Sequence, residues 1–476
     1  MNSDTAELAI LDTASELAAP FRTPASGSGG VGFVRRPWSR LRADPARMAA
    51  VSDSWRALWS SRLLVWLAGM GTVAAVGFGP VRNAFNPPGV TRGFGWLGDL
   101  LAAPAARWDA SWYLVIAHYG YRPDLGSFTS SRTAFFPLYP LGLHAIAWSG
   151  APPVAAGVLL SLMALSLSLY GIHRLTTLEL TPSGPSAIAQ PSGRDVARLA
   201  VLITAFAPMA FYFSAVYSES LYLALSVGLF LCARRGHWAA AGALGALAAA
   251  TRSAGVLLLL PALILYLYGP REDRAPDFPS VRFPRPRYRP RADILWLAIV
   301  PAGLALYMAY LALAGGEGLM PFHAQDVWGR HFAGPYLGVW DGVKAAFQGA
   351  RQLLSFQRHH VYFPSAGGSP FVDAGHNLML LAFLLAAVPA VVGVLRRLPL
   401  AYGVYVLAAL ALPLSYPVTP QPLMSLPRFL VVLFPLSMWF AAWLAAHPRA
   451  QRPALAASAL LMAFFVAQFA TWHWVA

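Results

Sequence analysis

The sequence predicts an all-α polytopic integral membrane protein, and its composition is the first reason. Of the 476 residues, 57% are hydrophobic and 12% are charged, with a mean hydropathy of +0.53. Soluble domains carry about 25% charged residues. The second reason is a long series of apolar segments, each close to the length that crosses a bilayer.

The net charge of +15 has a topological explanation. Most arginines fall in short connections between apolar segments, and positive charge marks the cytoplasmic connections of membrane proteins. We therefore expect membrane lipids and no nucleic acid as partners. Cys232 is the single cysteine, which excludes a disulfide framework and a cysteine-built zinc site.

Two regions are predicted. Residues 1–60 contain TPASGSGG and seven arginines but no apolar signal-peptide core, so we expect a disordered basic cytoplasmic tail. Residues 61–476 form one polytopic membrane domain. Its eleven predicted spans are 63–79, 151–172, 196–214, 219–233, 236–250, 254–269, 293–314, 376–394, 398–416, 427–446 and 453–475.

The connections between these spans alternate in arginine content. The cytoplasmic set carries arginine and comprises 173–195, 233–238, 271–291, 396–397 and 447–453. The N-terminus is therefore predicted on the cytoplasmic side of the plasma membrane and the C-terminus on the outer side. The long outer loops are 81–150 and 315–375.

Residues 134–149, AFFPLYPLGLHAIAWS, are apolar but do not fit the alternation. Counting them as a span would place the arginine-rich 271–291 loop outside, and Pro137 and Pro140 disfavour a straight helix. We expect an interfacial helix that lies against or dips into the outer leaflet.

The ionisable residues gather on one side. Asp109, Glu219, Arg252 and Arg428 stand at the predicted outer ends of apolar segments, and none falls at the centre of a span. A transporter places such residues near the bilayer midplane, on broken helices in repeated halves, and the sequence has no internal repeat. The pattern favours an enzyme acting on a lipid-carried substrate, with a lipid-linked sugar flippase or transporter as the alternative.

Five stretches carry a resemblance to a known family: RWDASWYLVIAHYGY, TAFFPLYP, FAPMAFYFSAVYSESLYLALS, ATRSAG and LPRFL. They resemble the PIG-V-type mannosyltransferases of the GT-C superfamily, which are related to GPI mannosyltransferase II. The resemblance covers about residues 60–475, and the arginine-rich composition with a single lysine suggests a bacterial member. Ala254 departs from the ATRSNG pattern expected of the family.

The resemblance implies a GT-C-type fold and transfer of mannose, with inversion, from a polyprenyl-phosphate-mannose donor. A GT-C enzyme that uses another sugar is the alternative. The acceptor is a hydroxyl of a glycan, glycolipid or protein on the outer face of the membrane. No cofactor is implied, since the lipid-linked sugar is a substrate. The family's catalytic base is an acidic residue of the first outer loop, which here is Asp109.

A carboxylate suits this role because inverting transfer needs a group that takes the proton of the attacking hydroxyl. If the segment is helical, an apolar stripe lays it on the membrane with Asp109 beside the stripe. The stripe consists of Trp108, Trp112, Ile116 and Tyr119. Alternatively, Asp109 pairs with Arg107 or caps the helix. Asp99 and Asp124 are weaker rivals, expected in solvated loops.

The donor phosphate requires positive charge near the bilayer. Arg428, Arg252 and Arg107 are the candidates, because a guanidinium donates two parallel hydrogen bonds to phosphate. Interfacial anchoring is the alternative for each. The candidates for sugar or acceptor contact are Tyr217, Ser218, Glu219, Trp108 and Trp112. The first three form the turn YSES, where helix capping is an equal alternative.

Loop 315–375 is rich in aromatic and histidine residues, which favour interfacial anchoring over acceptor binding. The residues are Trp328, His331, Trp340, His359, His360 and Tyr362. The adjacent histidines lack the spacing of a helical metal-binding pair, so we predict no metal site.

Overall fold

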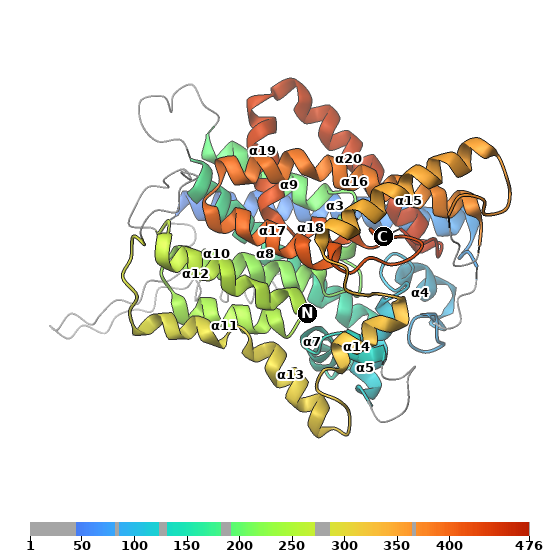
Figure 1. The fold of residues 1–476 in the computed structure, drawn as a ribbon, viewed down its shortest axis with the longest axis horizontal. Coiled ribbons are helices and arrows are strands. Elements are labelled where there is room, and N and C mark those ends of the chain that lie inside the picture. Colours follow the sequence, from blue (N-terminus) through green and yellow to red (C-terminus); the bar gives the residue numbers. More distant parts are fainter. Residues whose placement is uncertain are drawn as a thin grey trace.

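The computed structural model describes residues 44–80, 85–122, 131–181, 192–271, 286–363 and 368–475. Within these ranges every regular element is a helix, either α or 3₁₀ (Figure 1). The predicted all-α class is confirmed for this part of the chain.

Four helices are long and apolar enough to cross a membrane. They are α3 (Pro45–Val76), α8 (Pro153–Leu180), α16 (Pro370–Arg397) and α20 (Pro448–Ala470). A fifth span results if η6 (Ala292–Ile299) and α13 (Ala302–Leu313), which are bent by 43° at their junction, count as one. By length and composition, the described residues thus contain four or five candidate spans, fewer than the eleven predicted.

The remaining predicted spans coincide with shorter helices. They are α9 (Gly193–Phe206), α10 (Glu219–Arg234), α11 (Trp238–Ala249), η5 (Ser253–Leu258) with α12 (Leu259–Tyr268), α17 (Leu400–Leu414), and α18 (Leu426–Val431) with α19 (Phe434–Ala446). A helix of 16 residues such as α10 rises about 24 Å, whereas the hydrocarbon core is about 30 Å thick. Length is the reason that these helices do not qualify individually as spans.

The N-terminal tail is shorter than predicted. Helix α3 begins at Pro45, because the Asp44 carboxylate accepts hydrogen bonds from the backbone N–H groups of Ala46 and Arg47. The prediction of disorder over residues 1–60 is therefore wrong for residues 45–60. Residues 1–43 lie outside the described residues.

Several short helices gather at one end of the helix bundle. They are α4 (Gly95–Ala102), α5 (Ala110–Tyr119), η2 (Ser131–Ala134), α7 (Leu138–Ala147), α14 (Met320–His323) and η7 (Ala324–Trp328) (Figure 1). Helix α7 has ten residues and rises about 15 Å, so it is too short to cross a bilayer, as predicted for 134–149. Helix α15 (Pro335–Ser355) packs along α16.

Helix α5 is not the surface helix that its apolar stripe predicted. Trp108 precedes the helix, and its ring contacts those of Trp472 and Trp474 at 5.6 and 5.3 Å. Ile116 is buried, whereas Tyr119 is exposed. The predicted stripe is wrong because α5 packs into the protein, against α7 and α8.

The two ends of α10 carry separate charged clusters. At its C-terminal end, Arg234 donates to the Glu179 carboxylate over 2.7 Å, and the Tyr402 hydroxyl donates to the same carboxylate. At its N-terminal end stands Glu219, which is fully buried. This second cluster, beside α5 and α7, borders a cavity.

Candidate active site

A cavity of about 350 Å³ lies where the ends of several helices meet. Its wall includes residues from α5, α10, the α11–η5 turn, η7, α17 and α18. The volume falls within the range of small-molecule sites. Among the described residues, the charged side chains of the wall are Asp109, Arg252, Arg330 and Arg428.

Asp109 stands immediately before α5 and faces Arg428. Nη1 of Arg428 lies 2.7 Å from Oδ2 of Asp109, and the side chains are 8% and 16% exposed. The Asp109 side chain makes no capping hydrogen bond to α5. Within the described chain its ion-pair partner is Arg428 and not Arg107. Neither structural alternative weighed from the sequence describes its position.

Arg428 bridges two carboxylates that are far apart in the sequence. Its Nη1 donates to Asp109, and its Nε donates to Oε1 of Glu219. Arg252 also donates to this oxygen, with Nη1 at 2.8 Å. A fully buried carboxylate such as that of Glu219 is costly unless it is paired and hydrogen-bonded. The two guanidinium groups supply that compensation.

Strained backbone flanks the Asp109–Arg428 pair on both sides. Trp108, which precedes Asp109, has φ 54°, and Ser425, which precedes α18, has φ 70°. Residues with a side chain pay on the order of 1–3 kcal/mol in this left-handed region. The surrounding packing therefore holds the backbone next to Asp109 and Arg428 in this strained conformation. Such strained residues cluster at functional sites.

Aromatic rings support Arg428 from behind. Its guanidinium lies 4.7 Å from the centre of the Tyr217 ring and 5.3 Å from that of Tyr212. The Tyr217 hydroxyl donates to the backbone carbonyl of Arg107 over 2.9 Å. Burial raises the pKa of Tyr217 well above its ordinary value, so the hydroxyl remains a donor. Tyr217 thereby links the RWDASWY segment to α18.

The five residues predicted to contact sugar or acceptor lie behind the cavity wall. Trp112 stacks on Phe135, with ring centres 5.6 Å apart, and the Ser218 hydroxyl is 2.9 Å from that of Tyr113. Phe135 and Tyr113 are wall residues. The other three are Trp108, Tyr217 and Glu219, described above. Each of the five thus touches or supports the wall without being part of it.

The three arginines predicted to bind phosphate have different surroundings. Arg252 and Arg428 belong to the wall. Arg107 is buried outside it, where Nε donates to the carbonyl of Ala470 and the guanidinium lies over the Trp472 ring. Burial lowers the pKa of Arg107 to about 10. Its contacts fasten the C-terminal segment to the turn before Asp109.

The rival acids lie elsewhere. The Asp99 carboxylate accepts the backbone N–H of Phe94 over 3.1 Å and is not a wall residue. Asp124 falls outside the described residues. His360 is paired with Asp373 at 3.1 Å. Across the described ranges, no group of three or more His, Cys, Asp or Glu side chains is arranged to hold a metal ion.

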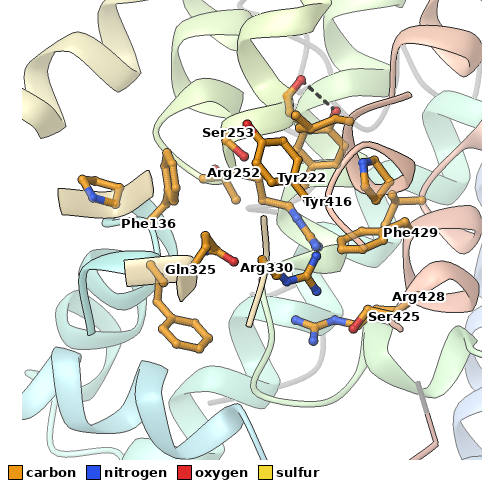
Figure 2. A pocket seen from close by; sticks show the side chains of 18 of the residues that line it. Phe136, Tyr222, Arg252, Ser253, Gln325, Arg330, Tyr416, Ser425, Arg428 and Phe429 are labelled. Carbon is orange, nitrogen blue, oxygen red and sulfur yellow. Dashed lines mark hydrogen bonds between the residues drawn. The ribbon is translucent and has the colours of Figure 1, made fainter. Parts of the chain in front are cut away.

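The sequence did not reveal several wall residues. Tyr222, Gln325, Arg330, Tyr416 and Ser425, which Figure 2 labels, come from segments far apart in the chain, and so does the wall residue Trp474. Trp328, interpreted as an interfacial anchor, also belongs to the wall. The available signal was Arg330 itself, an arginine in a loop predicted to lie outside, where positive charge is not required for topology.

Comparison with known proteins finds one similar family. Residues 79–263 match the family model described as Mannosyltransferase (PIG-V). No curated protein and no solved structure matches the chain. The matched segment contains Asp109, Glu219 and Arg252, whereas Arg330 and Arg428 lie beyond it. Residues 79–263 are thus similar to the PIG-V mannosyltransferase family, which supports a glycosyltransferase, and the apolar helices indicate a membrane protein.

Proposed function

We propose that this protein transfers mannose from a polyprenyl-phosphate-linked donor to an acceptor hydroxyl, with inversion, and that Asp109 is the catalytic base. The observation that carries the proposal is the Asp109–Arg428 ion pair in the wall of the cavity. The family match over residues 79–263 supports mannose as the sugar and, in general terms, the use of a lipid-linked donor and an acceptor.

The reaction requires one proton transfer and one exchange of bonds at the sugar. The acceptor oxygen attacks C1 from the face opposite the phosphate, and the Asp109 carboxylate takes the hydroxyl proton. A bond forms between the acceptor oxygen and C1, while the bond between C1 and the phosphate oxygen breaks. The electron pair of that bond leaves with the polyprenyl phosphate. Arg428 binds Oδ2 of Asp109, so we assign the proton to Oδ1.

The rest of the wall suits a sugar bound next to a phosphate. Hydroxyl and amide side chains offer hydrogen bonds for sugar hydroxyls, and Trp328 offers an aromatic face. These polar side chains belong to Ser253, Gln325, Tyr416 and Ser425. Arg252 and Arg428 add positive charge for the phosphate. The acceptor is a hydroxyl of a glycan, a glycolipid or a protein.

We further propose a GT-C-type fold with eleven membrane crossings, in the plasma membrane, with the cavity on the outer face. The charged cavity residues gather at one end of α10, and the Arg234–Glu179 pair lies at the other. Arg234 belongs to a connection that the arginine pattern assigns to the cytoplasm. Charges at the edge of the bilayer fit group transfer, whereas a flippase places them along the midplane.

Incubating the purified protein with radiolabelled polyprenyl-phosphate mannose and membrane extract tests the function. We expect label in a new glycosidic product, with none from a nucleotide-linked mannose. A parallel reaction with polyprenyl-phosphate glucose tests the sugar. Movement of the donor across vesicles without a new glycosidic bond would contradict the proposal and favour transport.

A further inference from the structure

Arg330 is the third arginine of the cavity wall, and its surroundings differ from those of the other two. Arg252 and Arg428 both donate to Glu219, and Arg428 also donates to Asp109. Within the described chain, the guanidinium of Arg330 has no carboxylate or hydrogen-bond partner. Figure 2 shows its side chain between those of Arg252 and Arg428.

The charges at this cavity do not balance. Among the described residues, three arginines of the wall face two carboxylates, those of Asp109 and Glu219. One positive charge remains. Burial, and the nearby charges of Arg428 and Arg252, lower the pKa of Arg330 to about 10, although Asp109 opposes this effect. The cation at Arg330 is therefore held at a free-energy cost, which an anion in the cavity would relieve.

The backbone directs Arg330 into the cavity. Helix η7 (Ala324–Trp328) ends at Gly329, which adopts the left-handed conformation with φ 67°. A residue with a Cβ would be strained there, whereas glycine is not. The turn folds the chain back, so that the N–H of Arg330 lies 3.4 Å from the carbonyl of Gln325. Gln325 and Trp328, on the same short helix, are also wall residues.

We propose that Arg330 binds the phosphate of the lipid-linked donor, while Arg428 acts mainly as the positioning residue of Asp109. The inference rests on the proposed function. A sugar phosphodiester carries one negative charge, which matches the surplus positive charge of the cavity. When the C1–oxygen bond breaks, its electron pair stays on the phosphate, and a second negative charge develops there. A guanidinium stabilises that developing charge with fork-like hydrogen bonds.

Direct binding of a radiolabelled polyprenyl phosphate to the protein in phosphatidylcholine nanodiscs tests this inference. Polyprenol, which lacks the phosphate, measures the contribution of the apolar chain. Arg330→Gln is expected to weaken polyprenyl phosphate binding by about tenfold to a hundredfold, the range for a lost charged hydrogen bond, and to leave polyprenol binding unchanged. Arg358→Gln is the matched control, because Arg358 is exposed in the same loop region and outside the wall.

Two further measurements distinguish phosphate binding by Arg330 from a loss of stability and from non-specific binding of anionic headgroups. The thermal midpoint of Arg330→Gln should equal or exceed that of the parent, because the variant removes a cation held near other cations. Added phosphatidylglycerol should not displace polyprenyl phosphate, whereas displacement at equal concentration would assign the site to anionic headgroups and overturn the inference. Unchanged polyprenyl phosphate binding in Arg330→Gln would also overturn it. If the parent binds polyprenyl phosphate through Arg330 but transfers no mannose, the proposed function fails and the phosphate site stands.

Discussion

Replacing Asp109 with asparagine removes the proton acceptor of the proposed reaction and keeps the size of the side chain. The amide oxygen can still accept the hydrogen bond from Nη1 of Arg428, which in the parent spans 2.7 Å. A missing general base lowers turnover by about 10²–10⁴-fold, equivalent to roughly 3–5 kcal/mol in the activation free energy. We expect a loss of that size in the rate of mannosyl transfer.

The effect on stability should be much smaller. Arg428 keeps its contact with Glu219, which it shares with Arg252, so the buried guanidinium retains one carboxylate partner after the substitution. The expected loss is about 1 kcal/mol, the difference between a charged and a neutral hydrogen bond. In a protein of 476 residues this moves the thermal midpoint by roughly 2 °C or less. Catalytic and structural effects are thus separable.

The assay combines single-turnover transfer from polyprenyl-phosphate mannose with the thermal midpoint of the same purified sample. Asp99→Asn is the matched control, because Asp99 is an acid of the same predicted outer loop that lies outside the cavity wall. We expect the control to retain normal transfer. Near-normal transfer by Asp109→Asn would refute the assignment of the base. A large drop in its midpoint would refute the argument that Arg428 remains compensated.

Three further predictions follow from the geometry. Arg428→Lys should lower turnover at least tenfold in steady-state assays, since one ammonium cannot replace two guanidinium nitrogens that bind different carboxylates, and a normal turnover would contradict this. Glu219→Gln should lower the thermal midpoint far more than Asp109→Asn, because the buried Arg428 and the half-buried Arg252 lose their shared carboxylate at a cost of roughly 3–5 kcal/mol, and an unchanged midpoint would exclude that role. In a Cys232→Ala background, Gln357→Cys should react with an impermeant thiol reagent from outside and Arg397→Cys should not; the reverse pattern would invert the topology.

Sequence patterns alone predict the class of the protein and several residues of its charged cluster. Within a bilayer, a long apolar segment forms a helix because a helix satisfies its own backbone hydrogen bonds. All eleven predicted segments coincide with helical residues. The short motifs around Asp109, Glu219 and Arg252 carried the family resemblance, and the family match includes all three. Local pattern was sufficient for these features, since each depends on a few consecutive residues.

Local pattern was not sufficient for the ends of the elements or for the environment of side chains. The composition of residues 1–60 predicted disorder, yet capping by Asp44 and burial of residues such as Ala50 and Ala57 extend α3 back to Pro45. The stripe on α5 predicted a membrane surface, yet the segment packs against α7 and α8. Apolar periodicity identifies a buried face, but it does not say whether protein or lipid covers that face.

Which charged residues share a site depends on how the helices pack. Asp109 and Arg428 are 319 residues apart, and the sequence around either residue does not indicate that the other is its partner. Arg107, two residues from Asp109, is instead turned toward the carbonyl of Ala470. Arg330 reaches the cavity because Gly329 reverses the chain after η7. An ion pair depends on a distance of a few ångströms in space. The separation of two residues in the sequence does not predict that distance, because it is set by the packing of the helices.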